Sequence, residues 1–227
     1  MGFAGLLIAL NIPYNSEAAL QTAATLTEFF QAHAHRASAD LATERGVFPA
    51  YRGSRLQTLH QRQRNATVTT IAPTGSISLI AGCSPGIEPV YGVQEVGRAM
   101  NGVVLTSLHP AFVPRALAFG PALDSLQPDL AAHPSIQHLP HIPEELRRLF
   151  VTAHDISPEH HVRMQAVFQR YSDSGVSNSI NLPATATKAE VAPVFLLAYQ
   201  LGCKGLTVFR SGSRERQVFS CSPSHPC

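Results

Sequence analysis

Residues 176–209 read VSNSINLPATATKAEVAPVFLLAYQLGCKGLTVF, and this stretch decides the fold class. Apolar and polar residues alternate over residues 176–182, which is typical of a strand with one buried face. Thr187 and Glu190 form a capping box at the start of a helix, and residues 204–209 are typical of a second strand. A strand, a helix and a strand in this order predict a βαβ unit with parallel strands. The sequence therefore predicts an α/β fold.

Caps and apolar periodicity also predict two helices before this unit. Ser16 is predicted to cap a long helix that ends near Arg45, with Gly46 after it. Ser157, with proline at the next position, predicts a helix through about Tyr171. Apolar residues at helical spacing predict the buried side of the long helix: Leu20, Ala23, Leu26, Phe30, Ala34, Ala37 and Leu41. The corresponding residues in the helix of the βαβ unit are Val191, Val194, Phe195, Ala198 and Leu201.

The composition indicates a globular protein that does not bind nucleic acid. Of the 227 residues 44% are hydrophobic and only 14% are charged, which suits one large domain or two small ones. A formal net charge of +2 and the absence of tryptophan argue against a nucleic-acid surface. Residues 3–12 are apolar, but no basic residue precedes them and the run is too short to span a bilayer. We therefore expect a buried element there and no membrane partner.

Histidine and cysteine spacings predict no metal site. His33 and His35 lie two apart on a predicted helix and so point to different faces, while His160 and His161 are adjacent. The four cysteines fit neither a zinc spacing nor a secreted disulfide framework. This cysteine usage favours a reducing compartment, and we expect the cytoplasm.

Residues 72–78, Ala-Pro-Thr-Gly-Ser-Ile-Ser, carry the best local signal for a ligand. They follow a β-branched run at 67–71, which predicts a buried strand, and they lead into a short helix predicted over 76–81. Such a turn presents backbone N–H groups and the positive end of a helix dipole to a phosphate. The turn matches neither standard nucleotide-binding motif, so an ordinary capped connection between a strand and a helix remains the alternative.

Several longer stretches resemble one enzyme family. Residues 64–78 read RNATVTTIAPTGSIS, residues 83–89 read CSPGIEP, residues 161–169 read HVRMQAVFQ, and residues 202–214 read GCKGLTVFRSGSR. In this order they are similar to the catalytic subunit of ribonucleotide reductase, and most similar to its adenosylcobalamin-dependent class II form. The resemblance extends to residues 1–7 and covers most of the chain.

The resemblance implies a fold and a division of the chain. The family's catalytic subunit is a ten-stranded α/β barrel with helices outside parallel strands, and this chain resembles its C-terminal portion. Residues 1–212 are expected to belong to the barrel, and residues 213–227 to form a flexible tail that is truncated or altered. The polar side chains of Ser177, Ser179 and Asn181 alternate with apolar ones and are expected to line the barrel interior.

The resemblance also implies whose phosphate is bound. In the family, the loop that matches residues 73–77 binds the phosphate groups of the ribonucleotide substrate. The implied binding residues, through two hydroxyls and four backbone N–H groups, are Pro73, Thr74, Gly75, Ser76 and Ile77. Ser78 is expected to support this loop with its hydroxyl. Glu88 has two interpretations, since its carboxylate either pins the loop from below or is solvated at the surface.

Thr207 and Val208 bear on the source of the radical. Class I enzymes, which receive their radical from a partner subunit, carry a tyrosine pair at the matching positions. Neither threonine nor valine is oxidised at accessible potentials, so no radical relay is expected through this strand. The resemblance therefore implies adenosylcobalamin, which generates a radical locally, as the cofactor of the intact enzyme.

The residues that carry out the family's chemistry are not expected in this chain. The radical-forming cysteine, the reducing cysteine pair and the assisting Asn and Glu lie on segments before the region that matches Met1, so no catalytic residue is assigned. Cys83 matches no catalytic position, and Cys203 is expected to be a small core residue. Cys221 and Cys227 either keep the redox role of the family's cysteine-rich tail or belong to altered sequence.

Two functions remain open at this point. In the first, the chain is a fragment of a class II ribonucleoside-diphosphate reductase, contributes the substrate-phosphate loop and is inactive alone. Its partners are then the N-terminal part of the same enzyme, the ribonucleotide substrate and a thioredoxin-like thiol reductant. In the second, it is a non-catalytic remnant or a stand-alone piece that binds nucleotide phosphate.

Overall fold

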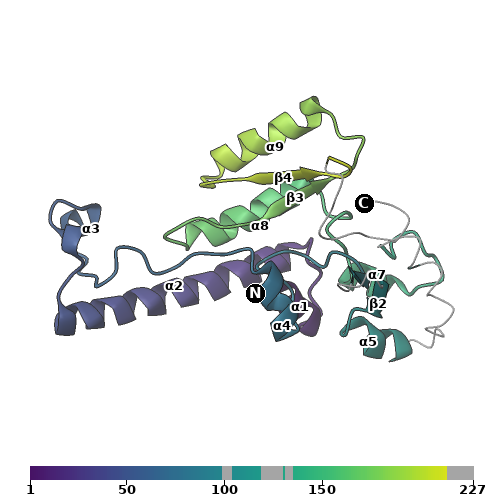
Figure 1. Ribbon diagram of the computed structural model, residues 1–227, viewed down its shortest axis with the longest axis horizontal. Helices are drawn as coiled ribbons and strands as arrows, with labels where there is room; N and C mark the ends of the chain where they lie inside the picture. Colours follow the sequence, from purple (N-terminus) through teal and green to yellow (C-terminus); the bar gives the residue numbers. More distant parts are fainter. Residues whose placement is uncertain (99–103, 119–129, 131–134, 214–227) are drawn as a thin grey trace.

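Strand β3, helix α9 and strand β4 form the predicted βαβ unit. The computed structural model of the chain describes residues 1–98, 104–118, 130 and 135–213 (Figure 1). Its elements are α1 (Phe3–Ala9), α2 (Glu17–Arg45), the 3-10 helix η1 (Pro49–Tyr51), α3 (Arg55–Thr58), α4 (Gly75–Ala81), β1 (Gln94–Arg98), β2 (Val104–Leu108), α5 (Phe112–Ala118), α7 (Glu144–Leu149), α8 (Pro158–Arg170), β3 (Ser179–Leu182), α9 (Lys188–Gln200) and β4 (Thr207–Arg210).

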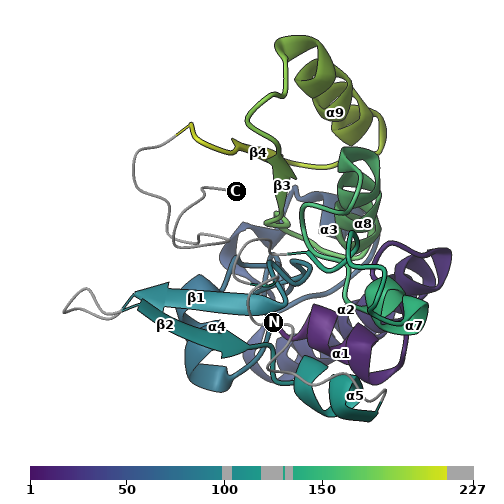
Figure 2. The ribbon, with the colours of Figure 1, turned by 90° about the vertical axis from the view of Figure 1, so that its right-hand side faces the viewer.

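The two strands of this unit are parallel, with Ser179 opposite Thr207 and Leu182 opposite Arg210. Figure 2 shows α8 and α9 together on one side of the strand pair. The side chains on this side are buried in one apolar cluster: Ile180 and Leu182 of β3, Val162 of α8, and Val194 and Ala198 of α9. The alternation predicted from the sequence is therefore confirmed, because Ser179 and Asn181 are only half-buried on the other face of β3.

The caps of the helices agree with the sequence. The Ser16 hydroxyl accepts the Ala19 N–H at 3.2 Å, and α2 ends at Arg45 before Gly46. The Ser157 side chain caps α8, and both hydrogen bonds of the Thr187–Glu190 capping box are present. These contacts are confirmed because a cap depends on residues within one turn of the helix end.

The buried side of α2 is predicted correctly only for its first half. Leu20 and Ala23 are buried, but Phe30, Ala37 and Leu41 are exposed, and Thr27, Ser38 and Ala42 are buried instead. The first half packs on α8, whereas the second half contacts residues 63–69 through polar side chains (Figure 1). Phe195 of α9 and Leu201, which follows its last residue, are likewise exposed rather than buried.

The buried strand predicted at residues 67–71 is wrong. The segment is extended, but its side chains are half-buried or exposed and only Ile71 forms a β-bridge, with Val176. The Ile71 N–H donates to Gly175 O at 3.2 Å, and the Ser177 N–H donates to Ile71 O at 2.9 Å. Thr69 and Thr70 use their hydroxyls for hydrogen bonds to Gln31 and Gly175. The segment therefore runs beside residues 174–177, just before β3, and only Ile71 packs against the core, where it is half-buried.

A larger apolar core surrounds the N-terminal helix. Phe3, Ala4, Leu7 and Ile8 of α1 are buried, whereas Leu6 and Leu10 are exposed, so the apolar run at residues 3–12 is a buried element on one face only. The Phe3 ring packs edge-on against Phe168 of α8, with ring centroids 5.0 Å apart. No helix in the described part of the chain has the length and hydropathy needed to cross a membrane. The core therefore joins the first residues of the chain to α8, where the last third begins.

Strands β1 and β2 form an antiparallel pair, with Gln94 opposite Leu108. The sequence places these strands at residues 90–96 and 103–106, so the first begins four residues later than predicted. Val90 instead forms an isolated parallel bridge with Thr152. Residues 99–103, 119–129, 131–134 and 214–227 lie outside the described part, and so do Cys221 and Cys227 and all of the predicted tail except Ser213.

Candidate functional site

The predicted phosphate loop lies at the entry to helix α4. Pro73 and Thr74 precede the helix, and Gly75, Ser76 and Ile77 form its first turn. The first N–H groups of a helix have no acceptor within that helix, so they remain available to a ligand. Pro73, Ser76 and Ile77 are exposed, and Thr74 and Gly75 are half-buried. The loop therefore presents polar backbone groups at an accessible surface.

Thr74 holds the loop in an unusual conformation. Its φ is +49°, in the left-handed region that a β-branched residue rarely adopts. The Thr74 Oγ1 accepts the N–H of Gly86 at 2.7 Å. Such a conformation persists only where surrounding contacts fix it, and it is common at ligand-binding sites.

Gly86 is required at the point where a second turn meets the loop. Its φ is +47°, and a Cβ at this position would lie 3.0 Å from Ala72 O and 3.6 Å from Pro73 O. Both neighbouring atoms belong to the backbone and cannot rotate away. Any residue with a side chain would therefore push this turn and the loop apart. We refer to residues 84–88 as the 84–88 turn.

The 84–88 turn is held by the N-terminal segment of the chain. The Gly2 N–H donates to Ser84 O at 2.7 Å. The Tyr14 hydroxyl donates to Ile87 O at 2.6 Å. Both tyrosine and Ile87 are buried. These two hydrogen bonds hold the turn independently of its contact with the loop.

Glu88 binds a strand rather than the loop itself. One carboxylate oxygen, Oε1, accepts the Ser179 N–H at the start of β3 at 2.8 Å. Burial raises the pKa of Glu88 to about 7, and the hydrogen bond from Ser179 offsets part of this rise. Burial, and next the charge of Glu88, hold the pKa of Tyr14 well above its ordinary value. The interpretation of Glu88 as a solvated surface group is therefore wrong, and its support of the loop stays a prediction.

Ser78 faces the inside of the loop. It is 2% exposed, and its hydroxyl donates to Gly75 O at 2.8 Å. This bond ties the first turn of α4 to its own next turn. This position is compatible with the predicted support of the loop by Ser78, which stays a prediction.

The paired histidines have structural partners. His160 Nε2 lies 2.9 Å from Tyr14 O, and His161 Nε2 lies 3.0 Å from Ala153 O. Burial lowers the pKa of His161 to about 4, so this ring is neutral at physiological pH. Within the described ranges, no group of three or more His, Cys, Asp or Glu side chains is placed to hold a metal ion.

Sequence analysis missed the polar cluster around Asp173. Its carboxylate lies 2.9 Å from His35 Nε2 and accepts the Val68 N–H at 2.7 Å and a Gln31 amide N–H at 2.6 Å. These hydrogen bonds outweigh burial and lower the pKa of Asp173. The cluster joins α2, the segment before the loop and the turn before β3, so it fixes the backbone on which the loop is mounted.

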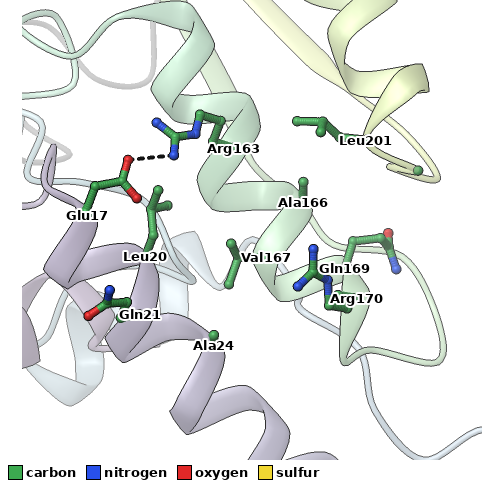
Figure 3. A pocket seen from close by; sticks show the side chains of 11 residues that line it. Glu17, Leu20, Gln21, Ala24, Arg163, Ala166, Val167, Gln169, Arg170 and Leu201 are labelled. Atoms are coloured by element: carbon green, nitrogen blue, oxygen red, sulfur yellow. Dashed lines mark hydrogen bonds and ion pairs between the residues drawn. The ribbon is translucent and has the colours of Figure 1, made fainter.

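A groove of about 450 Å³ lies elsewhere, between α2, α8 and the end of α9 (Figure 3). Its charged walls are partly neutralised, because Arg163 contacts Glu17 at 2.6 Å (Figure 3). Leu20, Val167 and Leu201 supply apolar wall. No residue of the 73–77 loop lines this groove, so it is not part of the predicted phosphate site.

The free thiols do not complete a redox centre. Cys83 is exposed beside the 84–88 turn, and Cys203 is half-buried. Burial raises the pKa of the Cys203 thiol, which keeps it protonated and unreactive. This agrees with the prediction that Cys203 is a small core residue.

Comparison with known proteins identifies the family. A family model described as the ribonucleotide reductase barrel domain matches residues 1–63 and 57–209. The chain belongs to the ribonucleotide reductase family. The reductase match therefore includes the 73–77 loop, the 84–88 turn and both strands of the βαβ unit.

Individual reductases match over nearly the whole chain. A vitamin B12-dependent ribonucleoside-diphosphate reductase of Thermoplasma acidophilum is 44% identical over 97% of this chain and 28% of its own length. One of Mycobacterium tuberculosis is 45% identical over 100% of this chain and 32% of its own length. The structure of a class Id ribonucleotide reductase alpha subunit of Actinobacillus ureae matches with a TM-score of 0.79 and 25% identity, covering 93% of this chain and 38% of that one. The chain thus spans about a third of the length of these reductases.

Replacing Gly86 tests the contact between the turn and the loop. We expect Gly86→Ala to lower the free energy of unfolding by about 1–3 kcal/mol, because its Cβ meets backbone oxygen and its φ is positive. Gly175→Ala is the control, since a Cβ there meets nothing within 4 Å. Equilibrium urea unfolding of both variants measures the difference. Equal effects of the two substitutions would contradict the close approach of Gly86.

Glu88 also predicts a pH dependence of stability. Its pKa is about 7 in the folded chain against an ordinary value of 4.5, so between these pH values the folded state holds a proton that the unfolded state lacks. Stability from this group is therefore greatest below pH 4.5 and falls as the pH rises through 7, by about 3 kcal/mol at most.

The Glu88→Gln variant removes this titration. Urea unfolding at both pH values measures the free energy of unfolding of the variant and of the parent. We expect the difference, variant minus parent, to be larger at pH 8 than at pH 5, because only the parent loses stability as Glu88 ionises. Glu28→Gln, an exposed position on α2, is the control. A difference between Glu88→Gln and the parent that is the same at both pH values would show that folding does not raise the pKa of Glu88.

Proposed function

We propose that this chain is part of a ribonucleotide reductase that converts ribonucleotides to deoxyribonucleotides by thiyl-radical chemistry. The observation that carries this proposal is the 44–45% identity, over 97–100% of the chain, to relatives named vitamin B12-dependent ribonucleoside-diphosphate reductases. Identity at this level along the whole chain favours a working part of such an enzyme over a non-catalytic remnant. Ribonucleoside diphosphates are therefore the proposed substrates.

We propose that residues 1–212 form part of a ten-stranded barrel with helices outside parallel strands. The parallel pair β3–β4, with α8 and α9 on one side, supports this arrangement (Figure 2). Ser179 and Asn181, on the face of β3 away from those helices, would then line the barrel interior with Ser177.

The 73–77 loop is the proposed site for the substrate phosphates. Its N–H groups and the hydroxyls of Thr74 and Ser76 offer donors to an anion at the start of α4. Pro73 precedes these donors, Ile77 supplies the last of the N–H groups, and a Cβ at Gly75 would meet nothing within 4 Å, so a ligand can approach the backbone there. Ser78 supports the turn from inside through its bond to Gly75 O.

Adenosylcobalamin is the proposed cofactor of the intact enzyme, because the relatives are named as vitamin B12-dependent. When bound, it supplies a radical by homolysis of its cobalt–carbon bond. The described residues contain no cluster of His, Cys, Asp or Glu that fits a cobalt ion, so no residue of this chain is assigned to it. Thr207 and Val208 of β4 have no oxidisable side chain, which agrees with a radical that is formed without relay through this strand.

The remaining partners follow from the part of the enzyme that this chain does not supply. The radical-forming and reducing cysteines are proposed to lie on the N-terminal part of the same reductase. A thioredoxin-like thiol reductant would then restore them after each turnover. The free thiols of Cys83 and Cys203 are compatible with a reducing cytoplasm, which is the compartment we propose.

The proposal predicts that the chain alone is inactive. We expect no deoxynucleotide when the purified chain is incubated with a ribonucleoside diphosphate, adenosylcobalamin and a dithiol, because none of its cysteines matches a catalytic position. A full-length B12-dependent reductase assayed in parallel is the positive control. Formation of deoxynucleotide by the chain alone would contradict the proposed division of labour.

The loop assignment predicts the effect of removing one hydroxyl. We expect Ser76→Ala to weaken binding of inorganic pyrophosphate about fivefold or more, since a hydrogen bond to a charged group is lost. Titration of the ¹⁵N-labelled chain, followed by the amide signals of residues 74–77, measures the dissociation constant. Ser213→Ala removes an exposed hydroxyl after β4 and is the control. Absence of any shift at residues 74–77 in the parent chain would overturn the phosphate site.

A further inference from the structure

We propose that Glu88 is a positioning residue for the phosphate loop, and that it acts by fastening the 84–88 turn to strand β3. The inference rests on the proposed function of the 73–77 loop and assigns Glu88 no contact with the substrate. It differs from a carboxylate that pins the loop directly, because Glu88 reaches the loop only through the 84–88 turn and the hydrogen bond from Gly86 to Thr74.

The first link joins the turn to the loop. The Gly86 N–H donates to Thr74 Oγ1 at 2.7 Å, and the Gly86 Cα approaches the backbone of Ala72 so closely that no Cβ fits. Thr74 keeps its φ of +49° against its own conformational preference. The backbone conformation of Thr74 sets the direction of the N–H groups of residues 74–77. A shift of the turn would therefore change how these N–H groups are oriented toward a bound phosphate.

The second link joins the turn to the strand. Glu88 lies two residues after Gly86, and the Glu88 N–H donates to Pro85 O at 3.0 Å, so these residues form one tight turn. Glu88 Oε1 then accepts the Ser179 N–H at 2.8 Å. Ser179 is the first residue of β3 and is paired with Thr207 of β4. The position of the loop is thereby linked to that of the β3–β4 strand pair.

The other anchors of the turn come from a different direction. Gly2 and Tyr14, which bind Ser84 O and Ile87 O, belong to the N-terminal segment around α1. They fix the turn to the core around α1. Glu88 adds a direct hydrogen bond from the turn to β3, to a residue 91 positions later in the sequence. The bridge between Ile71 and Val176 ties the chain before the loop to the same region, but it does not contact the turn.

A carboxylate at position 88 does not serve stability alone. A mostly buried carboxylate costs free energy when it is ionised, and leucine or glutamine would avoid that cost. An ionised acceptor, however, makes a stronger and more directional hydrogen bond to an N–H group than a neutral one does. Residues that lower stability in exchange for a fixed geometry are found at functional sites.

Two titratable groups near Glu88 or its partners, Tyr14 and His160, bear on a pH experiment on Glu88. The Tyr14 pKa is raised well above 10, so its hydroxyl stays protonated at pH 6 and pH 8. His160 of α8 contacts Tyr14 O, and burial lowers its pKa below 6.5. Ser179 contributes a backbone N–H, which does not titrate.

The test is pyrophosphate binding to the full 227-residue chain, with the amide signals of residues 74–77 as the readout. Glu88→Leu removes the acceptor, and we expect a dissociation constant raised about fivefold or more. Glu88→Gln keeps an amide oxygen but no charge, so its ratio to the parent chain should exceed about twofold at pH 8 and approach one at pH 6. The titration of pyrophosphate itself cancels in this ratio. Glu28→Leu and Glu28→Gln are the matched controls.

The outcomes separate this inference from the proposed function. If Ser76→Ala weakens binding while both Glu88 variants bind as the parent does, the loop assignment stands and the positioning role is overturned. If Ser76→Ala has no effect, or the parent chain does not bind, the phosphate site fails and the inference fails with it. If Glu88→Leu does not fold, the pH-dependent ratio of Glu88→Gln decides, because a merely structural loss would not follow the ionisation of one carboxylate.

Discussion

The hydrogen bond from the Gly86 N–H to Thr74 Oγ1 is the contact on which the site depends. It fixes a threonine in the left-handed region, and that conformation aims the first turn of α4 outward. Three neighbouring contacts keep the donor in place, from Gly2, Tyr14 and Ser179. The loop is thus held by its surroundings rather than by its own sequence, which explains how a seven-residue helix can keep a defined start.

The 73–77 loop and the 84–88 turn make contacts with two hydrophobic regions of the structure or with elements next to them. On one side, α1 is buried against α8 and the segment around Tyr14. On the other, β3 and β4 pack against α8 and α9. Helix α8 belongs to both, so its position relates the N-terminal anchors of the 84–88 turn to the strand that Glu88 contacts. The proposed phosphate role would explain this arrangement, since a loop that binds a substrate phosphate must be placed accurately against the rest of an active site.

What the sequence predicted was local. The caps at Ser16, Ser157 and Thr187 depend on neighbours within one turn, and the alternation in β3 records which face is buried. The start of α4 follows from the same local logic. The family was also recognisable, because long runs of sequence carry it.

What the sequence did not predict depends on distant partners. The outer half of α2 turns polar residues inward because Asp173, which lies 138 residues after His35, offers them a carboxylate. The run at 67–71 satisfies β propensity but has backbone hydrogen bonds only to residues 174–177, so it stays at the margin of the core, with Ile71 half-buried against it. In the sequence, Tyr14 only follows an apolar run and Gly86 only follows a proline. The sequence around Glu88 does not indicate that its carboxylate binds the Ser179 N–H. Periodicity and propensity contain no information on such pairings.

The 91-residue separation between Glu88 and Ser179 has a consequence for how the protein is made. Synthesis proceeds from the N-terminus, and contacts between distant segments form only after the intervening chain has emerged and its loop has closed. The turn can meet Gly2 and Tyr14 early, but the hydrogen bond to β3 must wait until the last third of the chain is synthesised. The 73–77 loop is therefore among the last features to reach its final geometry, and the contact proposed to position it forms only after most of this chain has been synthesised.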